Sequence, residues 1–207
     1  MTTSFRFLAR RLLLRLLPVL PVLPVLALLA VTPGARAQTP PLATLQAAGS
    51  ELVFTIRQMG VPVEGRFERF QAQIAFDPRQ PARGRVGITI DTGSARFGAR
   101  EIDAEVPKPA WLGAVAFPQA SFRSTTIKAL GGGRFEVGGE LTLKGRAQPV
   151  IVPVQITQSG RQSTARGSFA VKRLAFGIGE GEWADTSLVA DEVQVRFSFA
   201  LDGLPPL

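Results

Sequence analysis

Apolar and polar side chains alternate along most of this chain, and that period of two limits the possible folds more than any other feature. In FEVGGELTLKG (135–145), Phe, Val and Leu alternate with Glu, Gly, Thr and Lys. The same alternation recurs at 70–76, 86–90, 150–156 and 193–201. It is typical of antiparallel strands with one buried face and one face in water. The fold class is therefore all-β.

Turn signals separate the alternating segments, at 77–84, 131–133, 158–162 and 176–187. Only 99–112 lacks the alternation, and its two prolines forbid a long helix. We expect a short helix at about 99–105, followed by an irregular crossing. About eight strands with one short helical excursion predict a closed or nearly closed antiparallel barrel, which has no exposed edges. A two-sheet sandwich is the alternative.

The amino-terminal segment has the pattern of an export signal. Basic residues between Arg6 and Arg15 precede an apolar run, 16–31, and the small-x-small site Ala35-Arg36-Ala37. A membrane anchor is the alternative, since the run is nearly long enough to cross a bilayer. Prolines at 18, 21 and 24 oppose it, because each costs a helix interior about 3 kcal/mol. We expect cleavage before Gln38 and a periplasmic protein.

Removal of 1–37 changes the charge argument. This segment holds five of the 24 basic residues and none of the 16 acidic ones, so the formal charge falls from +8 to 19 minus 16, or +3. The remaining arginines form no stripe and have no aromatic side chains between them, so we expect no nucleic-acid partner. We divide the rest of the chain into a lead-in (38–46), a barrel domain (47–203) and a tail (204–207).

The missing residue types exclude several chemistries. The chain has no Cys, His or Tyr. Disulfides, thiolate chemistry and Ser-His-Asp catalysis are thereby excluded, and so are nearly all zinc sites. An enzyme here would depend on carboxylates, lysine or serine. We expect no metal site and no cofactor.

A barrel of about eight strands either fills its interior with side chains or encloses one ligand. Apolar residues at inward positions are candidates for both roles, and Gly139 among them predicts open space. The candidate ligand-binding residues are Phe54, Phe70, Phe76, Ile88, Phe122, Val137, Leu141, Val154, Phe169, Trp183, Val195 and Phe197.

An ordered series of motifs resembles the YceI-like family over about residues 47–201. The series is SELVFTIRQMG (50–60), VEGRFERFQAQIAFDP (63–78), VGITIDTGS (86–94), FPQASFRST (117–125), GELTLKGRAQPVIVPV (139–154), KRLAFGIGEGEW (172–183) and VADEVQVRF (189–197). The resemblance implies an eight-stranded antiparallel lipocalin-like β-barrel. It also implies an elongated apolar cavity for polyisoprenoid chains. Two positions depart from the family pattern: Gln58 replaces a frequent histidine, and Ile102 replaces an arginine before Asp103.

The glycine-rich segment 176–187 suggests a phosphate cradle at first sight. Such a cradle needs a helix after its glycines, whereas this segment lies between two strand patterns. We interpret it as a hairpin loop whose glycines adopt positive φ, with Trp183 as a lid over the barrel mouth. Arg57, Arg66 and Arg69 are candidates to pair with a phosphate head group; a solvated strand face is the alternative.

Three functions follow as hypotheses. The first is an exported carrier that binds an isoprenoid or other long-chain lipid without catalysis and exchanges it at a membrane surface or with a membrane protein. The second is a carboxylate-based hydrolase that uses Asp103, Glu180, Glu182 and Asp185. The third is a ligand-free accessory protein of a stress response or a membrane electron-transfer system. The oligomeric state is left open.

Overall fold

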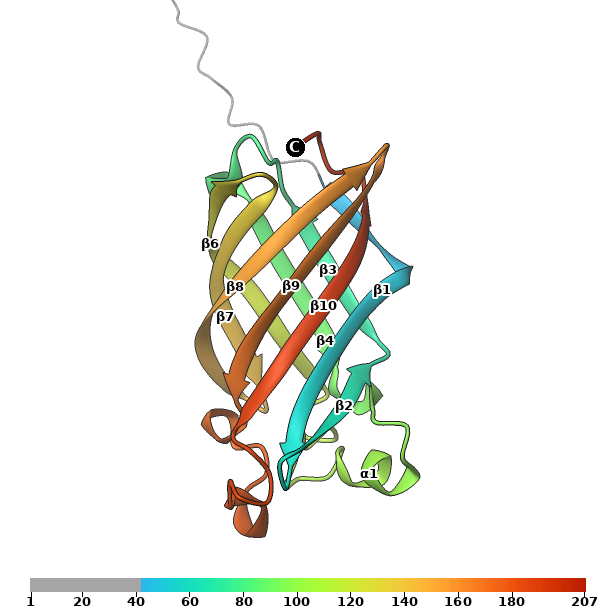
Figure 1. The fold of residues 1–207 in the computed structure, drawn as a ribbon, viewed down its shortest axis with the longest axis vertical. Coiled ribbons are helices and arrows are strands. Elements are labelled where there is room, and N and C mark those ends of the chain that lie inside the picture. The colour runs from blue at the N-terminus through green and yellow to red at the C-terminus, as the bar shows by residue number, and fades with distance from the viewer. Residues whose placement is uncertain (1–41) are drawn as a thin grey trace, which may run out of the picture. The chain divides into compact units, whose positions relative to one another are not determined.

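The protein is a closed antiparallel β-barrel, as Figure 1 shows for the computed structural model, which describes residues 42–207. Eight strands make the ring: β1 (Leu42–Gln58), β3 (Phe70–Ala75), β4 (Arg85–Asp91), β6 (Gln119–Gly131), β7 (Arg134–Leu143), β8 (Arg146–Ser159), β9 (Gln162–Lys172) and β10 (Glu192–Asp202). Pairing of β10 with β1 closes it. The predicted barrel is therefore confirmed, and the sandwich alternative is wrong. The predicted export signal lies outside the described residues.

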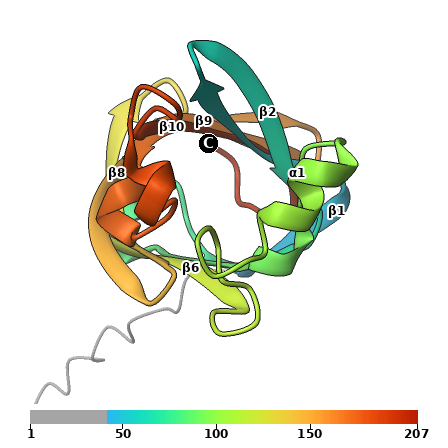
Figure 2. The same cartoon turned by 90° about the horizontal axis from the view of Figure 1, so that it is seen from below.

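Shorter elements gather at one end of the barrel, which we call the mouth (Figure 2). They include strands β2 (Val61–Phe67) and β5 (Ala95–Arg96) and helix α1 (Arg100–Glu105). Single 3₁₀ turns occur at η1 (Pro81–Arg83), η2 (Thr92–Ser94), η3 (Arg173–Phe176) and η4 (Gly181–Ala184). The helix predicted at 99–105 is confirmed. We name the segment 176–190, which includes η4, the lid.

Both predicted boundaries of the barrel domain lie too far inside the chain. Strand β1 begins at Leu42, within the expected lead-in, and Leu42 and Ala43 pair with β3. At the other end, Leu204 is buried in the core, and the amide of Leu207 donates to the side-chain oxygen of Gln158 (2.9 Å). The lead-in and the tail therefore contribute to the barrel.

A large bulge interrupts β1. Residues 47–50 of β1 lie opposite the single residue Phe199 of β10, because the register moves from Gln46↔Ala200 to Glu51↔Ser198. The Ser50 hydroxyl holds the bulge by donating to Gln46 O (2.6 Å) and accepting from the Ala200 amide (2.9 Å).

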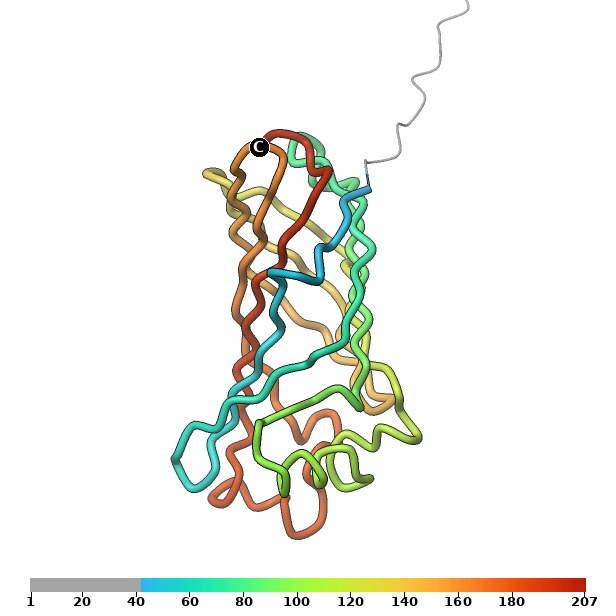
Figure 3. Tube along the Cα trace, turned by 90° about the vertical axis from the view of Figure 1, so that its right-hand side faces the viewer, coloured from blue at the N-terminus to red at the C-terminus, as the bar shows by residue number. Residues whose placement is uncertain are grey.

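After the bulge, β1 leaves β3 and pairs with β2 instead, from Val53 to Gln58. The separation of the β1–β2 hairpin from β3 is visible in Figure 3. The wall of the barrel is therefore split on this side.

Glycines in the wall give room to phenylalanine rings. A Cβ on Gly139 would lie 2.6 Å from the ring of Phe122, and one on Gly167 would lie 2.5 Å from the ring of Phe197, its cross-strand partner. The expectation that Gly139 leaves open space is therefore wrong. The missing side chain lets an aromatic ring lie against the neighbouring strand.

Candidate functional site

The barrel encloses two adjoining apolar chambers, which together we call the lumen. The lower chamber, about 280 Å³, lies at the mouth, where α1 and the lid cover it. The upper chamber, about 170 Å³, lies within the barrel, and every residue that lines it is apolar. Phe67, Leu143, Val171 and Val195 line both, so the chambers are successive parts of one interior space. Strand alternation creates it by turning one side chain in two inward.

Eleven of the twelve predicted ligand-binding residues line the lumen. The upper chamber takes Phe76, Ile88, Phe122, Val137, Leu141, Val154, Phe169 and Phe197; the lower takes Phe54 and Trp183; Val195 lines both. Phe70 lies elsewhere: its ring packs on Phe199 (centroids 5.4 Å apart) and faces an outer groove. The inward set was thus read correctly from the sequence, and its role in binding is a proposal.

Sequence reasoning missed the side of the lower chamber that α1 and the segment after it cover. Ile102, Val106, Trp111 and Leu112 line it from the segment that has no alternation. The only sequence signal was the apolar content of that proline-bearing segment. Gln58 and Ile102, the two departures from the family pattern, both line this chamber, so it lacks a histidine and an arginine at these places.

One buried arginine holds the lid. Arg173 is 2% exposed, and its guanidinium donates five hydrogen bonds to backbone carbonyls at 2.6–3.1 Å. The acceptors are Ile178, Gly179, Trp183, Val189 and Ala190, all within the lid. Burial lowers the pKa of Arg173, and nearby Asp191 opposes this shift. A guanidinium has five N–H donors, so each one is used to shape the lid.

The lid also reaches across the mouth to the segment after α1. Trp183 contacts Trp111 with ring centroids 5.4 Å apart, and the Gly179 amide donates to Ala110 O (2.7 Å). Gly177, Gly179 and Gly181 have φ between 67° and 72°, which confirms the predicted hairpin loop with positive φ. Trp183 lies over the lower chamber, in keeping with a lid.

Three of the four carboxylates proposed for a hydrolase have a structural contact. Glu180 pairs with Lys144 (3.7 Å) and Arg146 (3.1 Å), and Asp103 accepts a hydrogen bond from the Phe97 amide (2.6 Å). Hydrogen bonds from Ser187 lower the pKa of Asp185, whereas a general acid needs a raised one. Glu182 lies exposed in η4. The geometry supports turn and lid formation and gives no acid–base pair.

Within residues 42–207, no three His, Cys, Asp or Glu side chains are grouped to hold a metal ion. No helix in that part of the chain is both long and apolar enough to cross a membrane.

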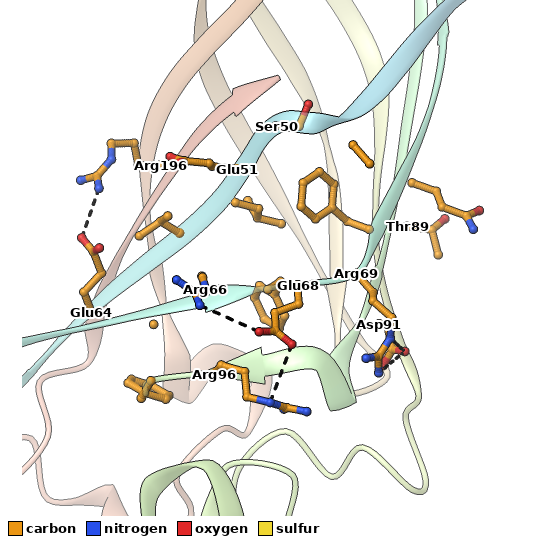
Figure 4. A pocket seen from close by; sticks show the side chains of 18 of the residues that line it. Ser50, Glu51, Glu64, Arg66, Glu68, Arg69, Thr89, Asp91, Arg96 and Arg196 are labelled. Carbon is orange, nitrogen blue, oxygen red and sulfur yellow. Dashed lines mark hydrogen bonds and ion pairs between the residues drawn. The ribbon is translucent and has the colours of Figure 1, made fainter. Parts of the chain in front are cut away.

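A second, polar cavity lies outside the split wall, and we call it the side groove (Figure 4). It has a volume of about 1260 Å³ and is bounded by the β1 bulge, the end of β2, the start of β3 and β5. Ion pairs join Arg69 to Asp91 (2.9 Å) and Arg196 to Glu64 (3.1 Å) along its rim. The predicted candidates Arg66 and Arg69 both line it, whereas Arg57 does not.

The family model for the YceI-like domain matches residues 44–201, nearly all of the described chain. The chain belongs to the YceI-like family. A UPF0312 protein of Vibrio cholerae is 26% identical over 159 residues, which cover 72% of this chain and 84% of that protein. A UPF0312 protein of Yersinia pestis is 34% identical over 108 residues, or 52% of this chain and 56% of that protein.

Solved structures show the same barrel. BcnA of Burkholderia cenocepacia is 42% identical with a TM-score of 0.73, covering 75% of this chain and 98% of BcnA. A polyisoprenoid-binding domain from Saccharophagus degradans has a TM-score of 0.62 at 15% identity, covering 80% of this chain and 99% of that domain. The latter likeness concerns the fold alone. Family membership and the enclosed apolar lumen together describe this chain as a YceI-like barrel with an apolar interior.

Proposed function

We propose that this protein is an exported, non-catalytic carrier that holds the tail of an isoprenoid or other long-chain lipid in its lumen. The observation that carries the proposal is the upper chamber, whose lining has no polar residue. A dry apolar cavity attracts only apolar ligands, because a polar group there loses its hydrogen bonds to water. The printed name of the Saccharophagus degradans domain, polyisoprenoid binding, points the same way.

The size of the lumen bears on which tail it takes. Each chamber alone, about 280 and 170 Å³, is smaller than the 300–1,000 Å³ of typical ligand pockets, whereas the whole lumen, about 450 Å³, falls at the small end of that range. A tail too long for this space requires phenylalanine rings of the wall to move, and Phe197 and Phe122 are placed to do so along the glycines beside them. Each buried CH₂ contributes about 0.8 kcal/mol, so a tail of several isoprene units offsets the cost of this rearrangement.

A tail bound this strongly would not leave for water, so we place exchange at a membrane surface or at a membrane protein. Exposed apolar side chains at the mouth support this: Met59 and Val61 in the β1–β2 hairpin, and Leu188 of the lid. The Met59 amide donates to Leu188 O (2.8 Å), so hairpin and lid present one apolar edge. The export pattern at 1–37 supports a periplasmic site for this exchange.

Binding is tested with the mature chain and geranylgeraniol, a C20 isoprenoid alcohol. The only two tryptophans of the protein, Trp111 and Trp183, both line the lower chamber, so their fluorescence reports on occupancy of the mouth. We expect saturable quenching or a spectral shift, and recovery of a long-chain lipid by solvent extraction and mass spectrometry of the purified protein.

Replacing Val137 by Asp should abolish binding of the lipid tail. Its side chain is buried in the upper chamber, where a carboxylate would oppose an apolar tail. Circular dichroism must first show that the variant keeps the barrel. No lipid in any preparation, together with no fluorescence response, would leave the ligand-free accessory protein as the better reading.

A further inference from the structure

The side groove is separated from the lumen by single side chains. Leu52 lines both the groove and the upper chamber, Phe97 lines the groove and the lower chamber, and Phe67 lines all three. Phe67 and Phe97 are half-buried, and both pack against the ring of Phe54, with centroids 5.0 and 5.2 Å away. Aromatic side chains therefore form the partition between a polar space outside and the apolar space inside.

The split wall places this partition beside open solvent. Because the bulge at 47–50 turns β1 away from β3, only Leu42 and Ala43 of β1 pair with β3. An amphiphile with its tail in the lumen has a polar exit here, through the side of the barrel. Figure 4 shows the arginines and acids gathered around this opening.

The charges around the groove favour one type of head group. Four arginines (66, 69, 96 and 196) face five carboxylates (Glu51, Glu64, Glu68, Asp91 and Asp103), so the lining carries one net negative charge at neutral pH. Each arginine has a carboxylate within 4.0 Å. An anionic head would meet arginines that are already neutralised and an excess of negative charge.

The same arginines retain donors for an uncharged head. In the described contacts, the ion pairs of Arg66 and Arg196 each use one terminal nitrogen, whereas a guanidinium has five N–H groups. These ion pairs are well exposed, with the Arg66 and Arg196 side chains 70% and 61% accessible, so little energy opposes their adjustment around a ligand. Hydroxyl, carbonyl and ether oxygens are the acceptors that suit such a site.

We propose that the side groove binds the uncharged, oxygen-bearing head of the lipid whose tail occupies the lumen, and that it discriminates against phosphorylated heads. This inference rests on the proposed function, since it needs a tail in the lumen. It reverses the expectation that Arg66 and Arg69 would pair with a phosphate.

The position of the lipid head in the side groove is tested by NMR of arginine side chains, with geranylgeraniol as the probe. We expect the Nε–Hε signals of Arg66 and Arg69 to shift at saturation, while that of Arg134, an exposed residue on β7, stays in place. Tryptophan fluorescence measures the binding of the tail in the same samples. Bound geranylgeraniol without any shift at the groove arginines would overturn the groove while leaving the carrier function intact.

Charge selectivity is tested with geranylgeranyl diphosphate, which has the same tail. Glu51 lines the groove, whereas Glu140 on β7 is also exposed but does not line it. Glu51→Gln should tighten diphosphate binding about threefold and leave the alcohol unchanged, because removing one nearby charge alters only the charged head. Glu140→Gln should change neither.

Two results would reject this selectivity. One is an equal response of diphosphate binding to Glu51→Gln and Glu140→Gln; the other is wild-type protein that binds the diphosphate more tightly than the alcohol. Failure of both lipids to bind at all would instead refute the carrier function, and the groove assignment with it.

Discussion

Arg173 shows how a single side chain organises the mouth. Its five carbonyl acceptors all lie in the lid, so the loop takes its shape from one buried cation. A buried charge is tolerated only when its donors are satisfied, and here the described side chains leave no buried polar atom without a partner. The arginine therefore ties five carbonyls of the lid to one buried side chain.

Replacing Arg173 by Met should lower the free energy of unfolding by about 3–5 kcal/mol, because two buried and three half-buried carbonyls of the lid lose their donors. Urea denaturation followed by tryptophan fluorescence measures the change. Arg166→Met is the matched control, since Arg166 is exposed on β9, the strand that ends just before Arg173. Equal midpoints for the two variants would contradict the role assigned to Arg173.

The exposed carboxylate of Asp185 has a pKa lowered by hydrogen bonds from the Ser187 hydroxyl (2.7 Å) and amide (2.8 Å). Ser187→Ala should raise that pKa toward its ordinary value, as an NMR titration of the side chain would show. Since the pKa is depressed in the folded state, any stabilisation of this turn is present above the unfolded pKa and is lost as the pH falls through the folded one. An unchanged titration would mean that the hydroxyl contributes nothing.

The lid allows a matched comparison between two glycines. Gly179 and Gly181 both have positive φ, which costs an alanine about 1–2 kcal/mol at either position. A Cβ at Gly179 would also collide with the Arg173 guanidinium, whereas one at Gly181 would meet nothing within 4 Å.

Gly179→Ala should therefore destabilise the protein by at least about 1 kcal/mol more than Gly181→Ala. It should also shift tryptophan emission to longer wavelength as the pair of Trp111 and Trp183 opens. Identical urea midpoints and spectra would show that the lid adapts without involving Arg173.

Contacts between glycines and phenylalanine rings in the strands should also contribute to the stability of the protein. Gly167→Ala places a Cβ 2.5 Å from the Phe197 ring and 2.5 Å from Pro153 O, so we expect a loss of about 1–3 kcal/mol in urea denaturation. Gly87→Ala in β4 is the control, because a Cβ there would meet nothing within 4 Å. A milder effect at Gly167 than at Gly87 would contradict this account.

Alternation in the sequence predicted the strands well and their pairing poorly. It correctly placed Phe122 and Val137 inside, because parity along a strand decides which face a side chain takes. The alternation within a strand contains no information about which other strand it pairs with. The bulge at 47–50 and the transfer of β1 from β3 to β2 therefore went unpredicted. The burial of Arg173 could have been predicted. It continues the alternation that turns Phe169 and Val171 inward, and an arginine at an inward position must have a buried partner.

The closed ring makes the domain one cooperative unit, and we expect a single unfolding transition by fluorescence and circular dichroism. A ligand that binds only the folded barrel should stabilise it by about 2.7 kcal/mol at a free concentration of one hundred times its Kd. Thermal denaturation with increasing geranylgeraniol measures this effect. Non-coincident transitions would mean that the mouth unfolds separately from the barrel.

The seam between β1 and β10 has one more consequence. Thr44 and Asp202 are directly paired, so the start of the first strand, β1, lies beside the end of the last strand, β10. A short linker between these points, with new termini cut at the Gly132 turn, would give a circular permutant that keeps every strand neighbour. Such a rearranged chain would place new ends, and any tag fused to them, at the tip of the β6–β7 hairpin.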